Sequence, residues 1–175
     1  MQSLDTPLWS FSLAVYGADG VAAECLDLQD RLDLDVNLLL FAAFAGAVGG
    51  VTLSAEDLAA ATETVAPWHN DVVRTLREAR RTLKPLAVDI EDPLRVAATS
   101  VRAQVKNAEL NAEKIEQAML WTWGERHFEG RPRGDRNDAL AANLSAVLAF
   151  YRGDGRDQSS IVRLREAAAR QVRKS

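Results

Sequence analysis

Hydrophobic residues recur along this chain at the three- and four-residue spacing of helices, and the alternation typical of half-buried strands is almost absent. Residues 36–48 are apolar nearly all round, which is typical of a helix that is buried on every side. Residues 92–123 carry the longest periodic pattern. The pattern predicts an all-α fold, a compact bundle of about seven or eight helices with a buried third helix and one long scaffold helix.

Capping residues mark where the first and third of these helices begin. Thr6 followed by Pro7 is typical of a helix start, and we expect that helix to end at Tyr16, before the break at residues 17–20. Asp35 precedes the apolar run and is expected to cap the third helix.

Proline and glycine predict the later boundaries. Pro67 is expected to open a fifth helix that ends near Lys84, because Pro85 falls in residues 83–92, which we interpret as a loop. Residues 124–136 hold three glycines and a proline and predict a second loop.

Length and composition predict one domain. The chain has 175 residues, 47% of them hydrophobic and 26% charged, as in an ordinary globular domain. We therefore expect residues 1–175 to form a single all-α domain, in which residues 152–175 are a candidate C-terminal extension.

The long helix carries a heptad pattern with two apolar sides. Its main seam alternates spacings of three and four residues, through Ala98, Val101, Val105, Ala108, Ala112, Ile115, Met119 and Thr122. On the opposite side lie Val96, Ala103 and Leu110, which indicate a second neighbour. If the chain's own helices leave part of the seam uncovered, a second copy of the chain would cover it.

Charge and cysteine content bear on location. The net charge of −4 argues against bulk nucleic-acid binding. The longest apolar run, residues 38–48, is too short to span a bilayer, and the first residues lack the basic start of a secretory signal. The single cysteine, Cys25, lies on an apolar helix face and is expected to be buried and structural. These features favour a cytoplasmic protein that does not associate with membranes.

Motifs for catalysis or cofactor binding are missing from the sequence. It contains no phosphate-binding glycine loop and no nucleophile elbow, and His69 and His127 have no partner at metal-ligand spacing. We therefore expect no catalytic residue, no metal site and no cofactor, and we favour a protein that is not an enzyme.

Three carboxylates on the long helix are the nearest approach to an acid–base or metal site. Glu109, Glu113 and Glu116 are spaced by four and three residues, but Arg102 and Lys106 continue the same helix edge. The preferred interpretation is an exposed edge stabilised by ion pairs along one helix.

The favoured function is a non-catalytic protein-interaction or regulatory protein that binds another protein or itself. The candidate interaction surface is a basic stripe on the fifth helix, formed by Arg74, Arg77, Arg81 and Lys84. An exposed part of the long seam is the other candidate surface.

Two alternatives belong to other classes. An aromatic-lined pocket near Trp9, Asn37, Trp68 and His69 would indicate a small-ligand-binding protein or an enzyme. Weak nucleic-acid binding through the basic helices would show a steep salt dependence, and the acidic net charge counts against it.

Three segments carry a resemblance to a known family. They read Trp-Ser-Phe-Ser-Leu-Ala-Val-Tyr at residues 9–16, Asp-Val-Asn-Leu-Leu-Leu-Phe at 35–41, and Ala-Pro-Trp at 66–68. With them, residues 8–123 resemble a proteobacterial family of uncharacterised proteins, a domain of unknown function. The resemblance implies a small, bacterial, cytosolic, helical protein and no established activity.

Overall fold

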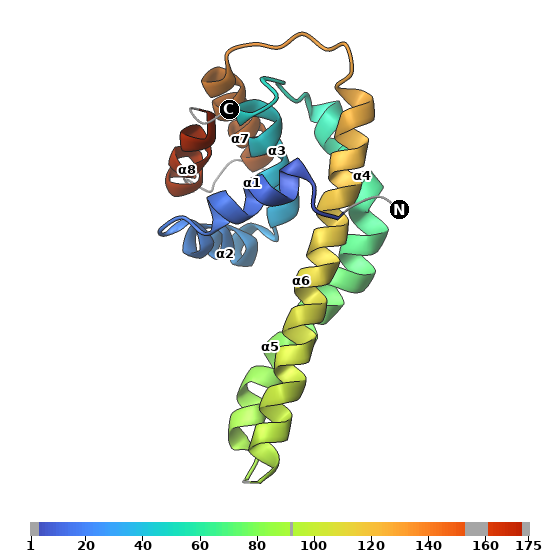
Figure 1. The fold of residues 1–175 in the computed structure, drawn as a ribbon, viewed down its shortest axis with the longest axis vertical. Helices are drawn as coiled ribbons and strands as arrows, with labels where there is room; N and C mark the ends of the chain where they lie inside the picture. Colours follow the sequence, from blue (N-terminus) through green and yellow to red (C-terminus); the bar gives the residue numbers. More distant parts are fainter. Residues whose placement is uncertain (1–3, 92, 153–160, 173–175) are drawn as a thin grey trace. The chain divides into compact units, whose positions relative to one another are not determined.

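The computed structural model describes residues 4–91, 93–152 and 161–172, and these form helices and connecting segments without a strand. The all-α prediction is confirmed. The helices are α1 (Pro7–Tyr16), α2 (Val21–Leu32), α3 (Val36–Ala47), α4 (Ala55–Trp68), α5 (Arg74–Asp89), α6 (Leu94–His127), α7 (Arg136–Arg152) and α8 (Val162–Val172) (Figure 1). No helix in the described part of the chain is both long and apolar enough to cross a membrane.

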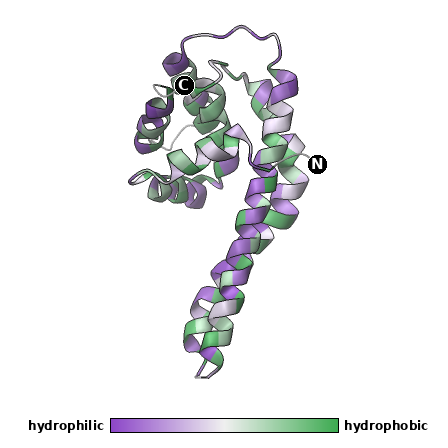
Figure 2. Ribbon diagram, in the orientation of Figure 1, coloured by the Kyte–Doolittle hydropathy of each residue, from purple (hydrophilic) through white to green (hydrophobic). Residues whose placement is uncertain are grey.

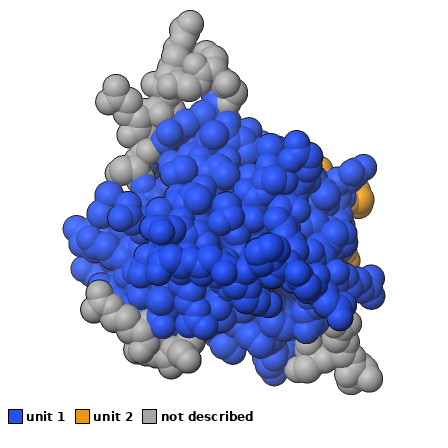
Figure 3. All heavy atoms as spheres, turned by 90° about the horizontal axis from the view of Figure 1, so that it is seen from above, with its two compact units in different colours: residues 1–64, 117–175 blue, residues 65–116 orange. Residues whose placement is uncertain are grey.

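The chain forms two compact units, which Figure 3 colours separately. Unit 1 comprises Met1–Thr64 and Gln117–Ser175, and unit 2 comprises Val65–Glu116. The single domain stays a prediction, because a compact unit is not by itself an independently folding domain. Residues 153–160 and 173–175 of the candidate C-terminal extension lie outside the described residues.

Helix α3 is the centre of unit 1, where it packs against α1, α7 and α8 (Figure 1). Ten of its twelve residues are buried, which confirms the buried third helix. Asp35 caps it as expected, since its carboxylate accepts a hydrogen bond from the backbone N–H of Asn37 at 2.8 Å.

The contact between α3 and α7 is a close approach of two backbones. A Cβ added to Gly46 of α3 would lie 2.5 Å from the backbone nitrogen of Leu140 in α7. One turn further along α7, the buried Asn143 side chain donates to the carbonyls of Ala42 and Val51 and accepts from the N–H of Leu53. These bonds satisfy the buried amide and hold α7 to α3.

Unit 2 is an antiparallel helical hairpin, shown in green and yellow in Figure 1. One arm runs through the end of α4, a π-helical turn (His69–Val73) and α5, and the other arm is the first part of α6. Helix α6 has 34 residues, and the predicted long helix is therefore confirmed.

Two prolines lie inside helices. The prediction of a loop at residues 83–92 is therefore wrong for residues 83–89, which are helical. Helix α4 continues through Pro67, and α5 continues through Pro85 to Asp89. A proline in a helix leaves the carbonyl four residues earlier without its N–H partner. Both prolines are exposed. Water can therefore reach those carbonyls, and the helices continue.

Helix α6 also continues to His127, so that the segment connecting it to α7 covers residues 128–135. His127 Nδ1 is 2.8 Å from the carbonyl oxygen of Trp123, and the two rings stack with centroids 4.2 Å apart. This stacking within one helix places His127 on α6 instead of in the expected loop.

Candidate functional site: the helical hairpin of residues 65–116

The inner side of the hairpin carries ion pairs between α5 and α6. Arg77 donates from Nε to the Glu109 carboxylate at 3.3 Å and from a terminal nitrogen to Glu113 at 3.0 Å. Arg80 also donates to both carboxylate oxygens of Glu109. Glu109 is buried, so this carboxylate is desolvated and depends on both guanidinium groups.

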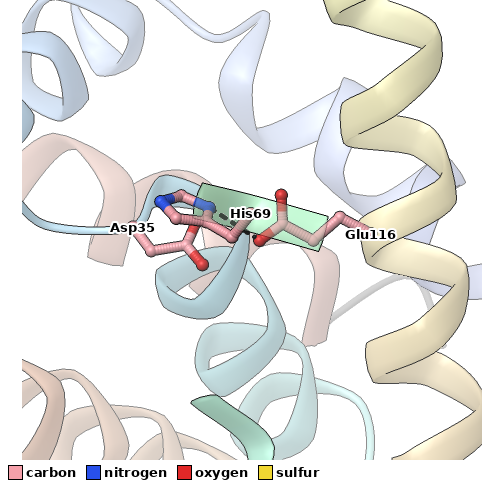
Figure 4. A group of neighbouring side chains, drawn as sticks. All are labelled: Asp35, His69 and Glu116. Atoms are coloured by element: carbon pink, nitrogen blue, oxygen red, sulfur yellow. Dashed lines mark hydrogen bonds and ion pairs between the residues drawn. The ribbon is translucent and has the colours of Figure 1, made fainter. Parts of the chain in front are cut away.

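A second polar pair lies at the π-helical turn. His69 Nδ1 is 3.0 Å from a carboxylate oxygen of Glu116, whose side chain is fully buried (Figure 4). With the proton on Nδ1, the ring donates to the carboxylate and Nε2 takes its acceptor form. The preceding Trp68 donates from its indole nitrogen to the carbonyl of Ala112 at 2.9 Å. Together these bonds fix the start of this arm against α6.

The π-helical turn explains why so many polar residues face α6. His69, Val73, Arg77 and Arg80 follow one another at spacings of four, four and three residues. A π-helical turn inserts one extra residue into the helix and so rotates the residues after it. This rotation keeps His69 and Arg77 on the same side of the arm.

The prediction that Glu109, Glu113 and Glu116 form an exposed helix edge is wrong. Glu109 and Glu116 are buried, and their partners come from the other arm of the hairpin instead of from Arg102 and Lys106. The sequence does contain one indication of the pairing between helices, since arginines on α5 are followed by glutamates on α6. Spacing within one helix cannot show which other helix packs against it.

The candidate interaction residues on α5 divide into two groups. Arg74, Arg81 and Lys84 are exposed. Arg77 is only partly exposed and is held by Glu109 and Glu113, so it stabilises the hairpin. Only the three exposed cations form a surface that a partner can reach.

The predicted seam of α6 is also divided. Ala98, Val105 and Ala112 are half-buried or buried, as expected for the side that faces the other arm. Val101 and Ala108 are exposed in the hairpin, with Val101 at 48%. Of the seam residues in unit 2, Ile115 is also half-buried, so that only Val101 and Ala108 are left exposed.

The four residues of the candidate pocket belong to both units. Trp9 and Asn37 lie on α1 and α3 of unit 1, where Asn37 is buried and accepts a hydrogen bond from the Gln117 amide at 2.9 Å. Trp68 and His69 lie in unit 2, in the contacts described above. The pocket stays a prediction.

Cys25 is buried in unit 1, as expected for a structural cysteine. Burial, with a smaller contribution from the nearby Glu24 carboxylate, raises the pKa of its thiol to about 12. A thiol with this pKa is protonated at neutral pH and is a poor nucleophile.

A family model described as "Protein of unknown function (DUF2390)" matches residues 7–120. The chain belongs to this family. The match confirms the resemblance to an uncharacterised domain family, and no curated protein and no solved structure is significantly similar to the chain.

The matched residues run from α1 to Leu120 of α6, and they include both arms of the hairpin. Helices α7 and α8 lie outside them. The hairpin and its ion pairs are therefore within the part of the chain that the DUF2390 family describes.

Proposed function

We propose that this DUF2390 protein is a non-catalytic interaction or regulatory protein of the cytosol, and that it binds an acidic protein partner through α5. The binding surface is the basic face, which we define as Arg74, Arg81 and Lys84. These residues are spaced by seven and three, so they share one side of the helix, and all three are exposed. This exposed row of cations is the observation that carries the proposal.

An apolar residue extends the basic face toward the end of α5. Val88 follows Lys84 by one turn and is 67% exposed. Cations beside an exposed apolar side chain suit an amphipathic acidic segment of another protein, because the segment gains both apolar burial and charge pairing. A phosphate backbone would use the cations alone, and the net charge of −4 opposes it.

The test is a pull-down with the full chain from native lysate at low salt. The variant Arg81→Glu/Lys84→Glu reverses two charges of the basic face and leaves Arg77 and its partners in place. The matched control, Arg165→Glu/Arg170→Glu, makes the same change in net charge at two exposed positions of α8. Circular dichroism of all three proteins verifies that the helices are intact.

We expect the wild type and the α8 control to recover one protein in near-stoichiometric amount, and the α5 variant to lose it. Equal recovery by the α5 variant would refute the basic face as the binding surface. Recovery of nucleic acid in place of protein, lost equally in both variants and falling steeply with salt, would favour the nucleic-acid alternative.

A further inference from the structure

The two flanks of the hairpin differ in charge. In an antiparallel helix pair, equivalent flanks of the two helices lie side by side, and the salt bridge between Arg77 and Glu113 marks one such flank. The opposite flank carries no charged residue at its seam positions on either helix, which are Ala79 and Leu86 on α5 and Leu94, Val101 and Ala108 on α6.

On α6 this flank is uncharged along its length. We define the uncharged seam as Leu94, Ala97, Val101, Gln104, Ala108 and Asn111, which alternate spacings of three and four residues. All six are exposed, Leu94 at 65%. Leu94, Ala97, Val101 and Ala108 are the apolar members, and Gln104 and Asn111 are polar but uncharged.

Exposed apolar residues are concentrated in the same hairpin. Figure 2 shows hydrophobic residues, in green, among hydrophilic ones along the hairpin. In the part of the chain that the structure describes, eleven large hydrophobic residues are exposed, and six of them lie between residues 86 and 110. Three of these six lie on the uncharged flank, namely Leu86, Leu94 and Val101. A hairpin of two helices has a single interface, so apolar residues on this flank can be buried only by a further layer.

We propose that a second copy of this chain covers the uncharged seam, so that two hairpins form a four-helix arrangement about a twofold axis. This contact is separate from the proposed basic face, which includes Lys84 on the charged flank. In a twofold contact each copy presents the same surface, and a charged surface would therefore meet its own charge. The seam has none, and Ala97 and Ala108 allow the second hairpin to approach closely.

The area available agrees with a dimer. Residues 94–115 span roughly 33 Å at 1.5 Å per residue. Two helices about 10 Å apart give a face roughly 20 Å wide. The flat footprint is then roughly 650 Å² per copy, and side-chain relief increases the accessible area toward the ~800 Å² per partner of a standard stable interface.

The experiment measures the mass of the full chain in solution by light scattering after size-exclusion chromatography. Interfaces of this size bind with micromolar or higher affinity. We therefore expect the wild type at about 100 µM to have twice the 19.1 kDa mass of one chain. Val101→Glu places a carboxylate in the seam of both copies and is expected to weaken the dimer at least about 100-fold.

The matched control is Leu110→Glu. Leu110 lies on the same helix and is 47% exposed against 48% for Val101, but it is outside the uncharged seam. We expect this control to remain a dimer and all variants to keep the helical content of the wild type. A wild type that is a single chain at about 100 µM would overturn the proposal. A dimer that Leu110→Glu weakens as much as Val101→Glu would also overturn it.

The same measurements separate this contact from partner binding. Arg81→Glu/Lys84→Glu is expected to lose the acidic partner and to stay a dimer. Loss of the dimer in this variant, with Val101→Glu unaffected, would overturn the uncharged seam as the dimer contact and leave the basic face as a surface for self-association.

Discussion

Replacement of Gly46 by alanine tests how closely α3 and α7 approach. The added Cβ would lie 2.5 Å from the backbone nitrogen of Leu140, 2.6 Å from its Cα and 2.8 Å from the carbonyl carbon of Ala139. Carbon atoms in contact are normally about 3.5–4.0 Å apart, so α7 must move by roughly 1 Å. The Asn143 hydrogen bonds to α3 and the following segment resist this movement.

Two opposing effects set the magnitude for Gly46→Ala. Overpacking of a filled interior costs about 1–3 kcal/mol, and we take the upper end because the obstacle is main chain and cannot change rotamer. Alanine in place of glycine inside a helix returns about 1 kcal/mol. The net loss in the free energy of unfolding is about 2 kcal/mol, or about 4–8 °C in Tm for a chain of this length.

Thermal and urea unfolding of the full chain, followed by circular dichroism, measure this loss. The control is Gly134→Ala, since no atom lies within 4 Å of a Cβ added at Gly134 and its φ is not positive. It should change stability by less than about 0.5 kcal/mol. If Gly46→Ala were as stable as this control, the close approach of the α3 and α7 backbones would be refuted.

Two further predictions concern buried polar and ionisable groups. Glu109→Gln removes the carboxylate charge that Arg77 and Arg80 share and should destabilise the protein by about 2 kcal/mol in urea unfolding. This is below the ~3–5 kcal/mol of a fully buried pair, because the arginines retain some solvent contact. Glu113→Gln, at a more exposed carboxylate, should cost less than about 1 kcal/mol, and an equal loss from both would contradict the buried pairing. Cys25, with its thiol pKa raised to about 12, should resist a thiol reagent at pH 8 until the chain is unfolded in denaturant. Rapid labelling of the native protein would contradict the burial of this thiol. The raised pKa also makes the free energy of unfolding depend on pH: its stabilising contribution is complete below the ordinary thiol pKa of about 8.5 and is lost as the pH rises from there toward 12.

Local sequence signals determined the individual helices of this protein. Thr6 and Pro7 begin α1, Asp35 begins α3, and the apolar residues 36–47 are buried as their pattern predicts. Capping depends on a side chain and the backbone a few residues away, and a helix that is apolar all round has to be buried in any soluble arrangement. These properties need no knowledge of which helices are neighbours.

The tertiary structure alone decided the polar contacts and the exposed surfaces of the hairpin. The heptad pattern of α6 predicted an apolar seam but not that α5 would cover only its Ala98, Val105 and Ala112 side. The partners of Glu109 and Glu116 are 29 to 47 residues away in the chain. The sequence predicts helix boundaries at Pro67 and Pro85, but both prolines are exposed and the helices continue through them. In each case the outcome depends on the free energy of contacts between distant segments and on access to water, which spacing along a single helix does not contain.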